Sequence, residues 1–290
     1  MTLFLGIDGG GTRTSFLLVD DSDREIAALK TGPSNCVSVG PEASRQAIEA
    51  GIRQLPAPPD VVGAGFAGAG RSDIRRHYEK VLRNLLPTSR IFAETDAFIA
   101  YIGAIGARPG LLLIAGTGSI VVGRRADGTM FRRGGWGPHF GDEGSGFWIG
   151  REAIREALRA RDCGPSDEFP RRIAVWLGLR SIEELVEAWA SGRIGVPDVA
   201  SLAEPVLADY PSQPAREIIE RAAVELRRMV DDAAASVGSS DIHLSASGSI
   251  ATHPRIQQLV GLRFTPPAYP PERGAILWAR EQLAARDALP

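Results

Sequence analysis

Two glycine-rich turns carry the residue types that bind phosphate. The first is Asp8-Gly9-Gly10-Gly11-Thr12, and the second is Gly116-Thr117-Gly118-Ser119. Glycines leave backbone N–H groups uncovered and allow positive φ, so such a turn can surround a phosphate, while a hydroxyl can donate to a phosphate oxygen. Asp8 could also hold a hydrated Mg²⁺. Either turn alone is more often a plain hairpin turn, but together they could hold one polyphosphate.

A carboxylate between these turns could act on a substrate hydroxyl group. Glu94-Thr95-Asp96 follows an expected strand at residues 90–93 and opens an expected helix at about residues 96–105. An acidic side chain at that point can reach a hydroxyl of a bound substrate. Because Asp is also a favoured helix-capping residue, the position by itself leaves capping as an equal alternative.

Residues 134–145 are rich in glycine and include Trp136 and Asp142. This composition is poor for a hydrophobic core, but it can bring backbone groups and a carboxylate against a polar ligand. A flexible surface loop is the alternative. His139 could serve as a base, but its neighbours are Pro and Phe, and we expect it to be a packing residue.

A fourth element, Ser245-Ala246-Ser247-Gly248-Ser249, places small residues between an expected strand and an expected helix. Small residues at this point leave room for a flat ring to lie on the backbone. A tight strand-to-helix connection would need similar residues, so this signal alone does not decide between the two.

The strands around the two turns are expected in the same order twice. Strand, glycine turn, strand, turn and strand occur at residues 3–8, 14–19 and 25–30, and again at 111–115, 120–124 and 130–133. Most of residues 143–238 are expected to be helical. The other expected elements are helices at about 41–55, 72–86, 96–105, 253–260 and 273–285, and strands at 61–66, 90–93, 242–246 and 263–264.

This order predicts an α/β protein made of two related domains. We expect an N-terminal domain at residues 1–106 and a C-terminal domain at residues 107–290, the latter with a helical insertion at about 143–238. The last helix is expected to pack back on the N-terminal domain.

Composition excludes several classes of protein. The chain has 290 residues and a formal net charge of −2, so no overall basic field attracts nucleic acid or membranes. Its lysines, Lys30 and Lys80, do not lie in the G-x-x-x-x-G-K-[ST] loop of phosphate-loop NTPases. Cys36 and Cys163 cannot form a C-x-x-C metal knuckle or a disulfide framework, which favours a reducing compartment. The apolar stretch at residues 3–7 is too short for a signal peptide, and we expect a cytoplasmic protein.

In this order, the elements resemble the sugar kinase and actin-like ATPase superfamily, and within it the BadF/BadG/BcrA/BcrD-type branch that includes N-acetylglucosamine kinases. The resemblance covers nearly the whole chain. It implies two actin-like (ribonuclease H-like) domains with mixed sheets flanked by helices and a cleft between the domains. The matching segments are DGGGT at 8–12, GPSN at 32–35, AGFAGAG at 64–70, ETDA at 94–97, AGTGS at 115–119, GGWGPHFGDEGS at 134–145 and SASGS at 245–249.

The resemblance implies that the cofactors are ATP and Mg²⁺. Asp8 would hold the metal through water. Asp96 would be the catalytic base that takes the proton from the sugar hydroxyl. The nucleotide-binding residues implied are Asp8, Gly9, Gly10, Gly11, Thr12, Gly116, Thr117, Gly118, Ser119 and, as a looser match, Gly248 and Ser249. The sugar-binding residues implied are Asn35, Asp96, Gly135, Trp136, Gly137 and Asp142.

The implied function is an ATP-dependent kinase that phosphorylates the 6-hydroxyl group of an amino sugar, with N-acetylglucosamine as the expected substrate. Glucosamine, N-acetylmuramic acid and glucose remain alternatives. The partner would be this small sugar, without nucleic acid or membrane, and a homodimer is compatible with the resemblance. A non-kinase alternative in the same branch is the ATPase activator of 2-hydroxyacyl-CoA dehydratases. That protein carries a cysteine just before its A-G-T-G turn, where this chain reads Leu113-Ile114-Ala115.

Overall fold

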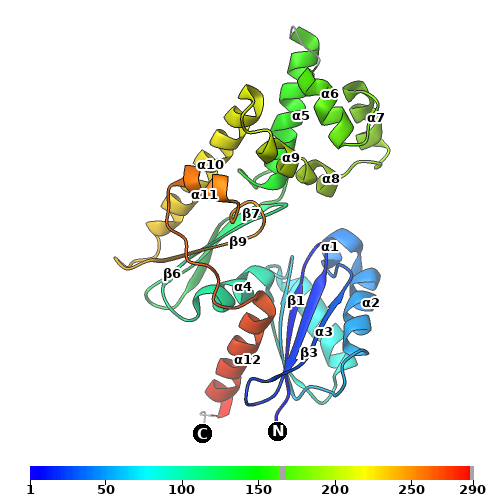
Figure 1. Ribbon diagram of the computed structural model, residues 1–290. Coiled ribbons are helices and arrows are strands. Elements are labelled where there is room, and N and C mark those ends of the chain that lie inside the picture. Colours follow the sequence, from blue (N-terminus) through cyan, green and yellow to red (C-terminus); the bar gives the residue numbers. More distant parts are fainter. Residues whose placement is uncertain (164–167, 288–290) are drawn as a thin grey trace. The chain divides into compact units, whose positions relative to one another are not determined.

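The computed structural model describes residues 1–163 and 168–287. The chain divides into two compact units (Figure 1). Unit 1 contains Met1–Ala107 together with the C-terminal segment that starts at Pro267, and unit 2 contains Arg108–Pro266. Among the described residues, none of the helices combines the length and the apolar character that a membrane span requires.

Unit 1 is built on a five-stranded mixed sheet with the order β3-β2-β1-β4-β5. β1 pairs antiparallel with β2, and β2 pairs antiparallel with β3, as short connections between strands require. β1 pairs parallel with β4, and β4 pairs parallel with β5. The strands are β1 (Phe4–Gly9), β2 (Thr14–Val19), β3 (Glu25–Thr31), β4 (Val61–Phe66) and β5 (Arg90–Thr95).

Helices cover both faces of this sheet. On one face, Leu5 and Val62 pack with Ile48 of α2 (Pro41–Ile52) and Leu82 of α3 (Ser72–Leu85). On the other face, Phe4 and its neighbours pack against α12 (Pro271–Asp287), which also packs against α4 (Asp96–Ile105). Successive residues of a strand point to opposite faces, which explains why apolar runs such as residues 3–7 supply both cores. A short helix that we did not expect, α1 (Cys36–Val39), precedes α2.

The C-terminal helix α12 lies very close to the sheet because glycines face it. A Cβ atom on Gly63 would lie 2.0 Å from the carbonyl oxygen of Ala275, and one on Gly6 would lie 1.9 Å from the carbonyl oxygen of Glu272. On the helix itself, a Cβ on Gly274 would lie 2.1 Å from the carbonyl oxygen of Ile99 in α4. These positions therefore require glycine for a steric reason.

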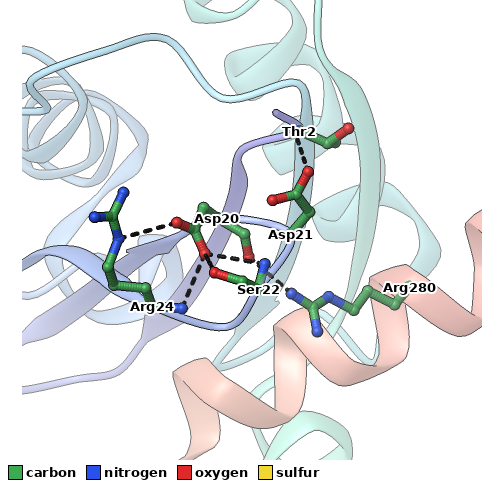
Figure 2. Close-up of polar contacts among 6 residues, drawn as sticks. All are labelled: Thr2, Asp20, Asp21, Ser22, Arg24 and Arg280. Atoms are coloured by element: carbon green, nitrogen blue, oxygen red, sulfur yellow. Dashed lines mark hydrogen bonds and ion pairs between the residues drawn. The ribbon is translucent and has the colours of Figure 1, made fainter.

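A polar cluster fastens α12 to the turn between β2 and β3 (Figure 2). The buried carboxylate of Asp20 accepts hydrogen bonds from the hydroxyl of Ser22 at 2.7 Å and from the backbone N–H and Nε of Arg24. These donors, the Ser22 hydroxyl first, lower the pKa of Asp20. Arg280 of α12 donates to the carbonyl oxygen of Asp20 at 3.0 Å.

Unit 2 repeats the first part of this topology. Its four-stranded sheet has the order β8-β7-β6-β9, with antiparallel β6–β7 and β7–β8 pairs and a parallel β6–β9 pair. β6, β7, β8 and β9 thus correspond in order and direction to β1, β2, β3 and β4. The strands are β6 (Gly110–Ala115), β7 (Ser119–Arg124), β8 (Met130–Gly134) and β9 (His243–Ser247). The expected α/β class, with mixed sheets flanked by helices, is confirmed.

Most of the described residues between Gly146 and Ala234 are helical. One hydrophobic core joins Leu111 and Val121 of the sheet to Phe147 of α5 and Leu226 of α10. The expectation of a strand at residues 263–264 is wrong. This segment forms no strand and is joined to the sheet by a single β-bridge between Ser245 and Thr265. The helices are α5 (Gly146–Cys163), α6 (Glu168–Trp176), η1 (Ile182–Glu184), α7 (Leu185–Ala190), α8 (Val196–Ser201), α9 (Ala203–Ala208), α10 (Gln213–Ala234) and α11 (Pro254–Val260).

Gly63→Ala should lower the free energy of unfolding by about 1–3 kcal/mol, because the new methyl group overlaps the backbone of α12. Gly32→Ala is the matched control, since no atom lies within 4 Å of a Cβ there, and its change should stay within about 0.5 kcal/mol. Urea denaturation followed by tryptophan fluorescence measures both. Equal midpoints for the two variants would contradict the close packing described for α12.

Candidate functional site

The turns and loops singled out in unit 1 meet at one edge of its sheet. β1, β4 and β5 run parallel, and their ends are in register because Gly9 pairs with Phe66 and Phe66 pairs with Thr95. β3 runs in the same direction, and Thr31 at its end pairs with Thr14, which pairs with Gly9. The segments that follow these strands therefore start at the same edge, and they contain the Asp8–Thr12 turn, Asn35, residues 67–70 and Asp96.

The Asp8–Thr12 turn leaves backbone donors open. The N–H of Gly10 donates to the carbonyl oxygen of Arg13 at 3.0 Å and closes the turn. In the described part of the chain, no group accepts a hydrogen bond from the N–H of Gly11 or Thr12. Both residues are exposed, and no atom lies within 4 Å of a Cβ on Gly11. This turn can therefore receive an anion on its open side.

Two acidic side chains near this turn resist ionisation. Burial raises the pKa of Asp8 to about 7, and the charges of Asp96 and Glu272 add to the rise, while Arg13 opposes it. Burial also raises the pKa of Asp96. Ionised Asp8 is therefore disfavoured both by burial and by repulsion from the other carboxylates, and a cation bound beside it would offset this cost.

The residues present fit a magnesium ion that is held jointly with a phosphate. Mg²⁺ prefers oxygen ligands and is commonly bound by one or two carboxylates, several waters and the phosphates of a substrate. Asp8 supplies such a carboxylate beside the open turn. Within the described residues, no group of three or more His, Cys, Asp or Glu side chains could hold a metal without further ligands. A metal here would depend on the nucleotide.

Asp96 does not cap its helix. The N-cap of α4 is Thr95, whose hydroxyl accepts a hydrogen bond from the N–H of Phe98 at 3.1 Å, and Asp96 is the first helical residue. The capping alternative is thus wrong. The carboxylate of Asp96 lies at the N-terminus of α4, where hydrogen bonds from the backbone N–H groups of Ala97 and Asp96 favour its charged form.

Only the oxygen of the Asn35 side-chain amide is used in a hydrogen bond within the described part of the chain. Its Oδ1 accepts a hydrogen bond from the N–H of Val37 at 3.1 Å and so caps α1. The Nδ2 group then remains as a donor for a ligand. Gly68, at φ +82°, approaches this side chain so closely that a Cβ would lie 3.4 Å from Oδ1. The residues between β4 and α3 thus lie against Asn35.

In unit 2, the second turn rests on the start of α5. The carbonyl oxygens of Gly116 and Thr117 accept hydrogen bonds from the N–H groups of Gly146 at 2.7 Å and Phe147 at 3.1 Å. Among the described residues, none accepts a hydrogen bond from the N–H of Thr117 or Gly118. Like the turn in unit 1, this one has free backbone donors.

Asp142 lies against the second turn. A Cβ on Gly118 would lie 2.7 Å from its Oδ2, and the N–H of Gly137 donates to its Oδ1 at 3.3 Å. Burial raises the pKa of Asp142. The residue also has φ +60°, a backbone conformation that is uncommon outside glycine and is frequent at functional sites. The structure therefore brings this expected sugar-binding residue to the phosphate-type turn of its own unit.

The rest of the 134–145 loop is exposed. Trp136 is 67% exposed and packs its ring under the guanidinium of Arg132, 4.4 Å from the ring centroid. Phe140 is 87% exposed, and His139 is also exposed, so the expectation that His139 is a packing residue is wrong. Gly135 and Gly137 both have positive φ, which allows the loop to fold back at Trp136.

Gly248 and Ser249 lie beside the second turn as well. Gly248 has φ +92°, and a Cβ there would lie 2.4 Å from the carbonyl oxygen of Ala115 and 3.2 Å from the N of Gly116. Ser249 is exposed. The second turn, Asp142 and the Gly248–Ser249 segment therefore form one group in unit 2, whereas the first turn, Asn35 and Asp96 form one group in unit 1.

Sequence reasoning missed two residues of the unit 1 group. Glu272 acts electrostatically on Asp8 from the first turn of α12, and Tyr78 of α3 bonds to the backbone beside Asn35. Neither lies in a motif, and both are brought to the site only by the packing of helices on the sheet.

Known proteins match this chain over most of its length. An N-acetylmuramic acid/N-acetylglucosamine kinase of Clostridium acetobutylicum is 34% identical over 218 residues, which is 72% of this chain and 71% of that protein. An N-acetyl-D-glucosamine kinase of Dictyostelium discoideum is 35% identical over 205 residues, 65% of this chain and 64% of that protein.

A solved structure and a family profile agree with these matches. The structure of a proposed N-acetylglucosamine kinase from Chromobacterium violaceum superimposes with a TM-score of 0.81 and 26% identity, over 96% of this chain and 98% of that one. The profile of the BadF/BadG/BcrA/BcrD ATPase family matches residues 5–279. The resemblance read from the motifs is confirmed, and the chain belongs to the BadF/BadG/BcrA/BcrD ATPase family.

Proposed function

We propose that the chain is an ATP-dependent sugar kinase that phosphorylates the 6-hydroxyl group of N-acetylglucosamine. One observation carries the proposal: the strands of the unit 1 sheet end in register, so the open Asp8–Thr12 turn, the amide of Asn35 and the half-buried carboxylate of Asp96 follow from the same edge. Phosphoryl transfer to a sugar needs these three groups, to hold the phosphate, to orient the sugar and to accept the proton. The names of the similar kinases support the same substrate class.

In this proposal, Asp96 is the general base. Its carboxylate accepts the proton of the sugar hydroxyl as the sugar oxygen bonds to the γ-phosphorus of ATP and the bond from that phosphorus to the oxygen of the leaving ADP breaks. A base in this role contributes about 10²–10⁴-fold to the rate. Burial raises the pKa of Asp96, which makes the carboxylate a stronger base than an exposed one. The Thr95 cap fixes the first turn of α4 and with it the backbone that carries this carboxylate.

Both turns contribute to ATP binding in this proposal. In unit 1, the N–H groups of Gly11 and Thr12 donate to phosphate oxygens, and Asp8 is the residue that holds Mg²⁺, through water. Bound Mg²⁺ would neutralise the charge of the phosphates. In unit 2, the N–H groups of Thr117 and Gly118 serve the phosphates, and the exposed Gly248–Ser249 segment receives the adenosine. Because ATP is supplied in the cytoplasm, the proposal includes a cytoplasmic location for this enzyme.

Sugar recognition is assigned to Asn35 and to the 134–145 loop. Asn35 donates from Nδ2, and the 134–145 loop contributes Gly135, Gly137 and Asp142, with Trp136 as an exposed aromatic surface. Each hydroxyl of a bound sugar needs a partner, because an unpaired buried polar group costs about 1–3 kcal/mol. Glucosamine, N-acetylmuramic acid and glucose share most of these hydroxyls and remain the competing substrates.

The decisive experiment is an ADP-release assay across hexoses, amino sugars and N-acetylated amino sugars, with Mg²⁺ present. We expect the largest kcat/KM for N-acetylglucosamine. A preference for glucosamine would keep the kinase assignment and overturn the substrate. Absence of sugar-dependent ADP release across the whole panel would overturn the kinase assignment itself.

Asp96→Asn should lower kcat at least about a hundredfold, because the amide cannot accept the proton, while ATP binding persists. The acidic limb of the wild-type kcat–pH profile should lie above the ordinary carboxyl pKa of about 4, since burial raises the pKa of Asp96. The limb should disappear in the variant. Asp21→Asn, in the exposed turn after β2, is the control and should leave kcat unchanged. Retained turnover in Asp96→Asn would remove Asp96 from the role of base.

Substitutions of Asn35 separate sugar binding from helix capping. Asn35→Ala removes both the Nδ2 donor and the acceptor for Val37, whereas Asn35→Asp keeps the acceptor and removes the donor. Both variants should raise the KM for the sugar about tenfold or more and change the KM for ATP little. Asn84→Ala, at an exposed position of α3, serves as the control. If Asn35→Asp behaves like the wild type, Asn35 is a capping residue only.

A further inference from the structure

The phenol of Tyr78 bridges the two peptide groups that flank Asn35. Tyr78 lies on α3 and is fully buried. Its hydroxyl donates to the carbonyl oxygen of Ser34 at 2.7 Å and accepts a hydrogen bond from the N–H of Cys36 at 2.9 Å. A single side chain therefore fixes the backbone immediately before and immediately after the residue that presents the amide donor.

The ring of Tyr78 is itself held in place. It stacks on Phe66, the last residue of β4, with ring centroids 4.0 Å apart and an interplanar angle of 7°. Burial raises the pKa of the Tyr78 phenol, so the hydroxyl keeps its proton and remains a donor. Through Tyr78, the backbone around Asn35 is therefore fixed relative to the end of β4.

Further hydroxyls hold the same loop from other elements. Ser44 of α2 donates to the carbonyl oxygen of Ser34 at 2.7 Å. The hydroxyl of Thr14 in β2 donates to the carbonyl oxygen of Gly32 and accepts a hydrogen bond from the hydroxyl of Ser34, both at 2.8 Å. These bonds restrain Ser34 and Gly32, but the Tyr78 hydroxyl is the side-chain group that reaches both sides of Asn35 in the described part of the chain.

The phosphate-type turn completes the restraint. The carbonyl oxygen of Gly10 accepts hydrogen bonds from the N–H groups of both Ser34, at 3.1 Å, and Asn35, at 3.2 Å. A Cβ on Gly9 would lie 2.5 Å from the hydroxyl oxygen of Ser34, so the turn and the Asn35 loop are in direct contact. The loop is therefore fixed on one side by the turn and on the other by Tyr78.

We infer that Tyr78 is a positioning residue for sugar binding, which acts by fixing the backbone on both sides of Asn35. The inference rests on the proposed function. Loss of the phenol hydroxyl would leave the N–H of Cys36 unpaired and would remove one of the two hydroxyl donors to the carbonyl of Ser34. Asp96 follows a different strand and is fixed by the Thr95 cap, so the chemical step should be spared.

The test is Tyr78→Phe, which keeps the ring and its stack on Phe66. The KM for the sugar should rise about threefold to tenfold, the range expected for one lost hydrogen bond, while kcat and the KM for ATP stay within about twofold. Ser44→Ala, which removes the other donor to Ser34, should raise the sugar KM less. Amide hydrogen exchange should become faster at Cys36 and Val37.

Ser89→Ala is the matched control. It removes a hydrogen bond of similar kind, from the Ser89 hydroxyl to the carbonyl oxygen of Pro59 at 2.6 Å, at the opposite edge of the same sheet. Its sugar KM and its exchange at Cys36 should equal those of the wild type. A general loss of stability would affect the two variants alike, and it would not raise the sugar KM while leaving kcat unchanged.

Two outcomes would overturn the inference. One is a sugar KM that is unchanged in Tyr78→Phe although Asn35→Ala raises it. The other is unchanged exchange at Cys36 and Val37. A wild-type protein that phosphorylates no sugar would instead refute the proposed function, and the exchange measurement would still report whether Tyr78 fixes the Asn35 backbone.

Discussion

The parallel pairing of β1 with β4 and of β4 with β5 is the constraint on which the unit 1 site depends. Parallel strands end at the same edge, so backbone pairing alone brings residues that are distant in sequence to one place. Asp8 lies at this end of β1, and Asp96 directly follows β5. The cost is that both carboxylates are poorly solvated: burial raises the pKa of each, and the charge of Asp96 adds to the rise at Asp8.

The same principle works in unit 2 with different residues. The parallel pairing of β6 with β9 brings the Gly116–Gly118 turn to the Gly248–Ser249 segment, and Gly248 is required there because a side chain would overlap the backbone of Ala115. What differs is the support beneath the turn. The unit 1 turn is fixed by the Asn35 loop, whereas the unit 2 turn is fixed by the first N–H groups of α5.

Motifs predicted much of this arrangement because each one joins a strand to the residue that does the chemistry. The glycine turns, the strand before Asp96 and the small residues near Gly248 could be read locally. The cap of α4 could not, because Thr95 and Asp96 are both good capping residues and only the backbone geometry decides between them. Tyr78 and Glu272 were beyond reach for another reason. The local sequence patterns of α3 and α12 do not predict which residues at this edge of the sheet each helix contacts.

The C-terminal helix has a consequence for the order in which the chain can fold. Phe4, Val61 and Phe92 lie on a sheet face whose cover, with Ile276 and Ala279, comes from α12. In the amino-acid sequence, all of unit 2 lies between these strands and the helix that covers them. During synthesis, this face of the first five strands is therefore covered only in part, by α4, until unit 2 and α12 have been made. Apolar surface that stays exposed in this way is a site of aggregation and of chaperone binding. A chain shortened before Pro271 would keep both phosphate-type turns and lose the helix that closes the first sheet.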